Sequence, residues 1–304
     1  MTDTTRGDGT MVAVLGLGAM GLPMARRLAE DLEVRGFDIA PGRLELGREA
    51  GVTPCESARD AVRGADAVLL AVRDSAQLED VLFGEHGVAQ EMGSGTVAIL
   101  TSTVGTDGIA AVAARLADLG IALVDAPLSG GPARAGEGDL LIVVGATPEA
   151  RQRAEPVLTR LASTLTVVGD RPGDGQALKT VNQLLCGVHI AAAAEALALA
   201  DALGLEPETT LEALGAGAGA SFMLGDRGRR MLRAYDDEGV EVLSRLDIFV
   251  KDMGIVADAL RARGIEAPVA GAARELFLRG RADGLGDADD SSVIRVVVPR
   301  RMRP

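Results

Sequence analysis

Short apolar segments recur through the first half of the chain and alternate with segments whose apolar residues follow helical spacing. The helical segments include residues 21–32 and 108–120. The short apolar segments lie at residues 11–18, 33–39, 65–72, 95–103, 121–128, 139–145 and 165–169. Because nearly all of their side chains are apolar, these segments suit strands buried on both faces. The alternation predicts an α/β domain with a doubly wound, parallel sheet covered by helices.

The strand pattern stops after Gly169, and the rest of the chain has helical spacing. Helices are expected at residues 176–203, 207–217, 241–264 and 269–284. Residues 170–175, DRPGDG, are rich in Gly, Pro and Asp, which is typical of a domain boundary. We therefore expect an α/β domain at residues 1–172 and an all-α domain at residues 173–304, joined by the long helix that begins near Gln176.

A glycine pattern, GLGAMG, lies between the first expected strand and the first expected helix. Gly16 permits a tight turn, Gly18 lets the backbone approach a pyrophosphate, and Gly21 allows close packing of the helix on the strand. Ala19 and Met20 stand where the helix begins, and its N-terminus would face the phosphates. The alternative is a structural glycine turn without a nucleotide. The position between strand and helix favours a dinucleotide-binding Rossmann domain.

Asp38 ends the second expected strand, about 20 residues after the glycines, as the dinucleotide fingerprint requires. A carboxylate at this position accepts hydrogen bonds from the adenosine ribose hydroxyls and repels a 2′-phosphate. Arg43 lies nearby and is the feature that would suit the phosphate of NADP. NAD is therefore the expected cofactor, and NADP is less favoured.

The composition indicates which binding partners and which cellular compartment are expected. The net charge of −13 and the pI near 4.7 oppose binding to nucleic acid or to an anionic membrane. The basic cluster at residues 299–304 is short and is expected to be a solvated tail. Cys55 and Cys186 match no metal-site spacing, so a reduced compartment and no metal are expected. The polar N-terminal segment and the lack of an uncharged apolar run of about 20 residues predict a soluble, cytoplasmic protein.

Lys179 lies in an otherwise apolar, alanine-rich helix. It shares one helical face with Asn182, Gln183 and Cys186. Loss of hydration at such a position lowers the pKa of a lysine and makes it a usable acid or base near neutral pH. The alternative is a lysine at a domain rim whose stem covers apolar surface. A second motif favours the catalytic lysine over the lysine at a domain rim.

That motif, DAPLSGGPARAGEGDL at residues 125–140, follows a predicted strand. Ser129, Gly130 and Gly131 offer a hydroxyl and closely spaced backbone amides, which suit a carboxylate. Four motifs, in the same order, resemble those of the β-hydroxyacid dehydrogenase family. They are GLGAMGLPMARRL for the cofactor, DAPLSGGPARAGEGDL for the substrate, GDGQALKTVNQ for catalysis and FVKDMGIV near the C-terminal end. Together they span nearly the whole chain.

The resemblance implies hydride transfer between a nicotinamide cofactor and a small hydroxy acid. It places the catalytic acid/base on Lys179 and a substrate-holding asparagine on Asn182. The second asparagine of the family is Gln183 here, which keeps the amide chemistry but changes its reach.

The resemblance also assigns roles in the other motifs. Ser129 and the amides of Gly130 and Gly131 would bind the substrate. Lys251 would lie beside the cofactor, and Thr103 would lie near the nicotinamide.

Within the family, the chain looks most like the branch that oxidises L-threonate, a four-carbon sugar acid, at C2. The segments LDIFVKDMGIVADAL, LLCGVHIAAAAEALALA and DADDSSVIRV carry this likeness. The alternatives are 3-hydroxyisobutyrate and tartronate semialdehyde as substrates. An imine-reducing relative and a noncatalytic NAD-binding protein are disfavoured by the presence of Lys179 and the Ser-Gly-Gly stretch. A homodimer or homotetramer is expected, as in the family, because the alanine-rich helix leaves small-residue surface for a partner.

Overall fold

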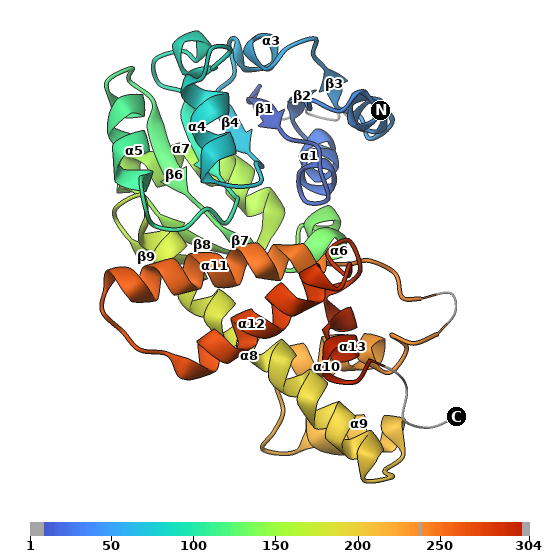
Figure 1. The fold of residues 1–304 in the computed structure, drawn as a ribbon. Coiled ribbons are helices and arrows are strands. Elements are labelled where there is room, and N and C mark those ends of the chain that lie inside the picture. Colours follow the sequence, from blue (N-terminus) through green and yellow to red (C-terminus); the bar gives the residue numbers. More distant parts are fainter. Residues whose placement is uncertain (1–8, 237–238, 300–304) are drawn as a thin grey trace. The chain divides into compact units, whose positions relative to one another are not determined.

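The computed structural model describes residues 9–236 and 239–299 of the chain (Figure 1). The chain divides into two compact units, Met1–Lys179 and Thr180–Pro304, called the first and the second unit below. Most of the predicted N-terminal polar segment, residues 1–8, lies outside the described residues, as do residues 300–304 of the predicted basic tail.

The first unit contains one sheet, and each strand predicted from the apolar pattern is present in it. The strands are β1 Met11–Leu15, β2 Glu33–Phe37, β3 Thr53–Pro54, β4 Ala67–Leu70, β5 Val97–Leu100, β6 Ala122–Asp125, β7 Leu128–Ser129, β8 Leu140–Gly145 and β9 Ala162–Gly169. Their order is β3-β2-β1-β4-β5-β6-β8-β7, with β9 paired to β8. The six strands from β3 to β6 are parallel and have the order of a Rossmann domain.

The expectation of a wholly parallel sheet is wrong at one edge. Strand β8 runs antiparallel to β6 and β7, and only β9 beyond it is parallel to β8. The connection from β7 to β8, residues 130–139, holds just the short helix α6 (Gly131–Glu137). It is shorter than the dozen or more residues that a parallel crossover usually needs, so the chain turns back instead.

Helices cover both faces of the sheet, as Figure 1 shows. Along β1, Val12 and Val14 point to one face, and Ala13 and Leu15 point to the other. The first face packs against α1 (Gly21–Ala29) and α7 (Pro148–Leu161), and the second against α3 (Ala58–Val62), α4 (Ser75–Phe83) and α5 (Ile109–Ala117). Helix α2 (Pro41–Glu49) follows β2. Burial on both faces explains why β1, β4 and β5 are apolar throughout, whereas β9, which was also expected to be buried, is mostly exposed.

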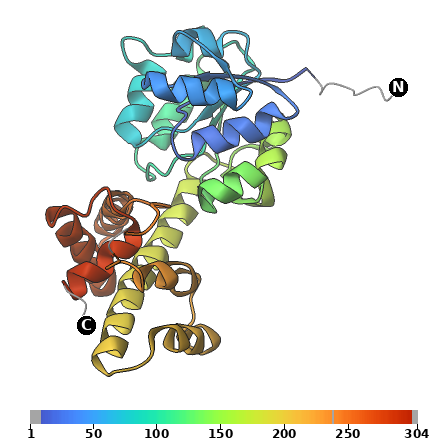
Figure 2. The ribbon, with the colours of Figure 1, turned by 90° about the vertical axis from the view of Figure 1, so that its right-hand side faces the viewer.

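Helix α8 (Asp174–Ala202) begins in the first unit and continues into the second, as one continuous helix (Figure 2). The second unit is all-α, as predicted. It continues with α9 Pro207–Ala216, α10 Phe222–Met231, α11 Leu246–Ala262, α12 Pro268–Ala282, the 3-10 helix η2 Asp290–Val293 and α13 Ile294–Val297. Its core is aliphatic apart from Phe249 and Phe277, whose rings stack with centroids 5.3 Å apart.

Among the residues that the structure describes, α8 is the one helix long and apolar enough to cross a membrane. In its most apolar window, 56% of the residues are buried inside the folded chain. Such burial is typical of the core helix of a soluble protein.

Helix α11 begins later than its apolar pattern predicts. The pattern extends from residue 241, but the helix begins at Leu246. The Asp289 carboxylate accepts hydrogen bonds from the backbone N–H groups of Leu243 and Ser244, at 3.0 and 3.3 Å. The Asp290 N–H donates to the Ser244 carbonyl at 2.7 Å. These bonds hold the segment outside the helix and override its helical spacing.

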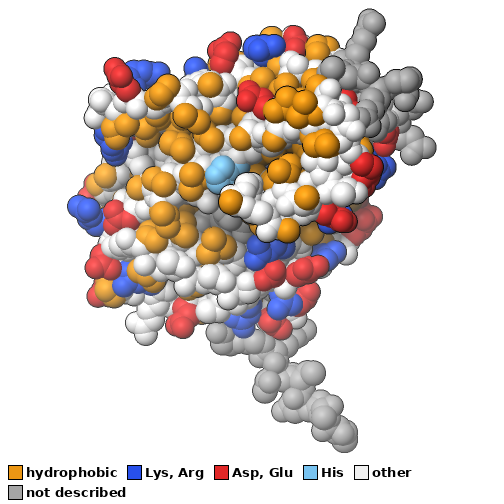
Figure 3. Space-filling view, turned by 90° about the horizontal axis from the view of Figure 1, so that it is seen from below, with side chains coloured by type: hydrophobic (Ala, Val, Ile, Leu, Met, Phe, Trp, Pro, Cys, Tyr) orange, Lys and Arg blue, Asp and Glu red, His pale blue; other side chains and the backbone are white. Residues whose placement is uncertain are grey.

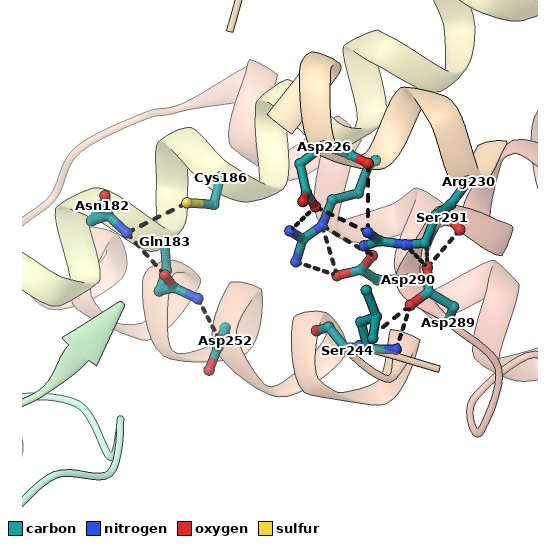
Figure 4. A network of polar contacts seen from close by, with 12 residues as sticks. Asn182, Gln183, Cys186, Asp226, Arg230, Ser244, Asp252, Asp289, Asp290 and Ser291 are labelled. Carbon is teal, nitrogen blue, oxygen red and sulfur yellow. Dashed lines mark hydrogen bonds and ion pairs between the residues drawn. The ribbon is translucent and has the colours of Figure 1, made fainter. Parts of the chain in front are cut away.

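The two aspartates belong to a buried ionic network, drawn in Figure 4. Arg227 donates to Asp290 with N···O distances of 2.9 to 3.3 Å, and Arg230 Nε donates to Asp289 at 2.9 Å. Both aspartate side chains are 0% exposed. Burial raises the pKa of Asp290, although Arg227 opposes the shift. The network joins α10 to η2 and so fixes the segment that leads into α11.

Arg227→Met should therefore destabilise the protein by about 3–5 kcal/mol at neutral pH, because it leaves the Asp290 carboxylate buried without its main partner. The loss should shrink as the pH falls, since a protonated Asp290 carries no unpaired charge. Urea unfolding at several pH values measures both effects. Arg48→Met breaks an exposed ion pair with Glu45 and is the control, with an expected change of about 0–1 kcal/mol. Equal changes in the two variants would contradict this account.

Candidate active site

The glycine loop after β1 requires glycine at two positions for reasons internal to the protein. Gly16 has φ +97°, and a Cβ on it would lie 2.4 Å from the Ala71 carbonyl oxygen. A Cβ on Gly21 would lie 1.9 Å from the Gly16 carbonyl oxygen, so α1 could not pack here with any other residue. These are the turn and packing roles expected from the sequence.

Gly18 differs from the other two glycines. A Cβ on Gly18 would meet nothing within 4 Å, so the protein itself does not demand glycine there. Ala19 is exposed beside it, and Met20, at the N-cap of α1, is half-buried. The open space above Gly18 suits the close approach of a pyrophosphate to the backbone.

Asp38 lies directly after β2 and next to the glycine loop. Its Oδ2 accepts a hydrogen bond from the Leu17 N–H at 2.7 Å, and its Oδ1 accepts from the Ala40 N–H at 2.8 Å. Each carboxylate oxygen keeps lone pairs that can accept from ribose hydroxyls. Arg43 is exposed on α2. The glycine loop and Asp38 thus form a cradle that fits the phosphates and the adenosine ribose of a dinucleotide.

Lys179 and Ser129 meet in the first unit, although 50 residues separate them. Lys179 Nζ donates to Ser129 Oγ at 3.1 Å. Lys179 is 8% exposed, and Ser129 lies on β7, four residues after the end of β6. A lysine at a domain rim would extend its ammonium into solvent, whereas this ammonium points to a hydroxyl in the motif expected to bind substrate.

Gly130 and Gly131 follow Ser129 and form the turn into α6. Their φ angles, +142° and +74°, lie in the range that favours glycine. A Cβ on Gly130 would lie 2.9 Å from the Leu140 side chain, whereas a Cβ on Gly131 would meet nothing within 4 Å. The turn therefore leaves backbone amides uncovered beside the serine hydroxyl.

Thr103 lies in the loop that follows β5 and is half-buried. The next two residues of this loop, Val104 and Gly105, donate their N–H groups to Gln176 Oε1 at 2.9 and 3.2 Å. Gln176 lies on α8, one turn before Lys179. The structure thus ties the loop of Thr103 to the helix that carries the lysine.

The second unit holds another polar group, of which Figure 4 labels Asn182, Gln183, Cys186 and Asp252. Gln183 Nε2 donates to Asp252 Oδ2 at 2.5 Å, and Lys251 Nζ lies 2.9 Å from Asp252 Oδ1. Asn182 Nδ2 donates to Gln183 Oε1 at 3.1 Å and to Cys186 Sγ at 3.4 Å. Asp252, which is 3% exposed, therefore links Gln183 on α8 to Lys251 on α11.

The sequence suggested Asp252 as a further pocket residue beside Lys251 but could not place it. The available signal was a lysine-aspartate pair, Lys251 and Asp252, within a mostly apolar helical segment. A carboxylate in such a segment needs a partner, and Gln183 and Lys251 are its partners here.

Lysine is scarce in this chain. The protein has 31 basic side chains, but only Lys179 and Lys251 are lysines, and the rest are arginines. Arginine serves as well as lysine for surface charge, but it stays protonated at all ordinary pH values and cannot exchange a proton. Both lysines lie in the polar groups described above. Such a distribution favours a chemical role for at least one of them.

No group of three or more His, Cys, Asp or Glu side chains in the described part of the chain could hold a metal ion.

Comparisons with known proteins support a dinucleotide-binding dehydrogenase. The NAD binding domain of 6-phosphogluconate dehydrogenase matches residues 11–169, and the NAD-binding region of NADP-dependent 3-hydroxyisobutyrate dehydrogenase matches residues 173–297. The L-threonate dehydrogenase of Cupriavidus necator is 38% identical over 286 residues, which cover 94% of this chain and 95% of that protein. The chain belongs to the β-hydroxyacid dehydrogenase family. The resemblance seen in the four sequence motifs is thereby confirmed.

Two further relatives of this dehydrogenase are similar over nearly their whole length. The 2-hydroxy-3-oxopropionate reductase of Escherichia coli is 31% identical over 284 residues, 93% of this chain and 95% of that protein. The solved structure of 3-hydroxyisobutyrate dehydrogenase from Salmonella typhimurium is 35% identical, with a TM-score of 0.85, over 94% of this chain and 99% of that one. The chain is accordingly an NAD-dependent dehydrogenase that acts on the CH–OH group of a hydroxy acid.

Two glycine variants should separate folding from cofactor binding in this dehydrogenase. Gly18→Ala should leave the free energy of unfolding nearly unchanged but weaken NADH binding, because its methyl group meets only the space for the pyrophosphate. Gly21→Ala should lower stability by about 1–3 kcal/mol or more, because its methyl group clashes with the Gly16 carbonyl. Urea unfolding and NADH fluorescence titration measure the two properties. Tight NADH binding by Gly18→Ala would refute the assigned pyrophosphate position.

Proposed function

We propose that this dehydrogenase oxidises a four-carbon sugar acid of the L-threonate type with NAD⁺, using Lys179 as the base. The observation that carries the proposal is the buried Lys179 side chain, whose Nζ lies 3.1 Å from Ser129 Oγ, in a chain with two lysines. The name of the Cupriavidus necator relative supports the choice of substrate.

The chain's own residues supply binding and proton transfer in this proposal. Ser129 and the amides of Gly130 and Gly131 hold the substrate carboxylate. Neutral Lys179 accepts the proton of the substrate hydroxyl while the C–H bond at the same carbon loses its hydride. NAD⁺, when bound, supplies the hydride acceptor, so the products are the oxo acid, NADH and a protonated lysine. Orientation of the substrate and a base already in place provide most of the acceleration.

Residues of the second unit complete the proposed assignment. Asn182 helps to hold the substrate, and Lys251 contributes to cofactor binding. Gln183 is proposed to act from its position on Asp252, which limits how far its carboxamide can move. Thr103 is assigned to the nicotinamide end of the cofactor.

The second candidate substrate class is a shorter hydroxy acid. The Escherichia coli and Salmonella typhimurium relatives bear the names of enzymes for such acids, 2-hydroxy-3-oxopropionate and 3-hydroxyisobutyrate. A noncatalytic NAD-binding role is the remaining alternative, and the hydrogen bond between Lys179 and Ser129 speaks against it.

A substrate panel tests the proposal. NAD⁺ and NADP⁺ reduction is followed with L-threonate, D-threonate, D-glycerate and both 3-hydroxyisobutyrate enantiomers. We expect the highest kcat/KM with L-threonate and NAD⁺, and Lys179→Ala should lower kcat by about 10²–10⁴-fold while NADH binding stays intact. Lys251→Ala keeps Lys179 and is the matched lysine variant, expected to weaken cofactor binding instead. Full activity in Lys179→Ala would refute the assigned base.

We also propose that the dehydrogenase is a cytoplasmic homodimer or homotetramer. Neither Cys55 nor Cys186 forms a disulfide, and Leu199, Leu203 and Leu205 of the second unit are 61%, 69% and 49% exposed. On the face shown in Figure 3, hydrophobic side chains gather toward the middle, and charged ones lie mostly around the edge. The Leu203 N–H donates to the Leu199 carbonyl, so these two exposed side chains lie one helical turn apart, and neighbouring exposed apolar side chains are typical of a subunit interface.

Light scattering during size-exclusion chromatography measures the oligomeric state directly. The wild type should elute as a dimer or tetramer, and the double variant Leu199→Glu, Leu203→Glu should dissociate because charge on this surface is costly to bury. Leu46→Glu, on an exposed site of α2, is the control and should not dissociate. A monomeric wild type would overturn this assignment.

A further inference from the structure

We propose that Asp125 and Gln176 form a positioning pair that holds Lys179 in register with Ser129 and with the loop of Thr103. The inference rests on the proposed function of Lys179. It concerns two buried residues to which the sequence motifs assigned no role.

Asp125 fastens the beginning of α8 to the end of β6. Its side chain is 0% exposed, and its Oδ2 accepts hydrogen bonds from the N–H groups of Gly173 and Gln176, both at 2.8 Å. The first N–H groups of a helix have no partner within the helix, and this carboxylate satisfies two such groups from a distant strand. Burial raises the pKa of Asp125, while these hydrogen bonds act against the shift.

Gln176 uses its full hydrogen-bonding capacity in joining three segments. Its Nε2 donates to Asp125 Oδ1 at 2.8 Å and to the Ser102 carbonyl at 3.0 Å. Its Oε1 accepts from the N–H groups of Val104 and Gly105. The side chain is 0% exposed, and a carboxamide can make two donations and two acceptances in this geometry. Neither Glu nor Met could make this set.

Gly175 shows how closely α8 approaches β6. A Cβ on Gly175 would lie 2.8 Å from the Asp125 carbonyl oxygen and 3.0 Å from its Oδ2. The first turn of α8 is therefore packed against the strand end with no room for a side chain.

The pair and the reacting groups lie on the same two segments. Ser129 comes four residues after Asp125, and Lys179 comes one helical turn after Gln176. Two hydrogen bonds join Gln176 to Asp125 and one joins Lys179 to Ser129, so the helix is attached to the strand-end segment at both places. Because Gln176 also binds the backbone on either side of Thr103, a shift of Gln176 moves Lys179 relative to both neighbours.

Gln176→Met tests the pair, because methionine is similar in size and makes none of these hydrogen bonds. A displacement of about 1 Å can cost about 10²-fold in rate, so we expect kcat to fall by about 10–100-fold with NADH binding little changed. Thr96→Val is the matched control. It removes a buried hydrogen bond to the Ala65 carbonyl at the opposite end of β5, and it should keep kcat.

A second measurement does not depend on activity. Because the chain contains two lysines, protein labelled with ¹³C at the lysine ε-carbon gives two side-chain signals, assigned with Lys179→Arg. In Gln176→Met the Lys179 signal should shift and the Lys251 signal should stay, whereas Thr96→Val should leave both in place. Gln176→Asn, whose carboxamide is one methylene shorter, is the second variant and should show the same changes at smaller size.

Specific outcomes overturn the inference. Unchanged Lys179 signals in both Gln176 variants would do so, as would a loss of kcat in Thr96→Val equal to that in Gln176→Met. Failure of the proposed function is visible separately, as an inactive wild type or an active Lys179→Ala variant. The labelled lysine signals still decide the positioning role in that case.

Discussion

The capture of the first turn of α8 by the buried carboxylate of Asp125 is the interaction on which the active site depends. It anchors the helix to the carboxyl end of β6, where a parallel sheet of this type presents its functional loops. The end of β6 sets the position of Ser129, and the first turns of α8 set the position of Lys179. A buried carboxylate is costly to retain, and satisfying otherwise unpaired helix N–H groups gives the fold a reason to keep it.

In this chain nearly all positive charge is carried by arginine, and lysine occurs at only two positions. Arginines provide the surface ion pairs and the network around Asp289 and Asp290, where a permanent charge and several donors are useful. Lysine remains at two positions, and each contacts a polar partner, Ser129 in one unit and Asp252 in the other. Lysine, the basic side chain that can release a proton, thus occurs only within two of the four family motifs, GDGQALKTVNQ and FVKDMGIV.

Much of the fold could be predicted because its signals are local. The apolar strands and the glycine loop can each be predicted from a few adjacent residues. The long helix could be predicted in the same way; it was expected at 176–203 and is found at Asp174–Ala202. Strands β3 and β7 could not be predicted, because two residues show no periodicity. The non-helical segment before α11 could not be predicted either, since Asp289, more than 40 residues later, overrides its helical pattern.

The candidate site was predictable to the extent that its residues lie in motifs. Lys179, Ser129 and Asp38 could be named from the sequence, but the hydrogen bond between Lys179 and Ser129 spans 50 residues and required the structure. The local signal for Asp252 was its place beside Lys251, whereas Gln176 is recognisable only by its partners. Their hydrogen bonds connect residues 51 to 74 positions apart, for which no local pattern exists.

The central claim is that Lys179 exchanges a proton rather than merely supplying a positive charge. Single-turnover hydride transfer in Lys179→Arg tests it most directly, because arginine keeps the charge and can still donate to Ser129 but does not deprotonate near neutral pH. The account predicts that the variant binds NADH and the hydroxy acid but transfers hydride about 10²–10⁴-fold more slowly. Hydride transfer at the wild-type rate would contradict it.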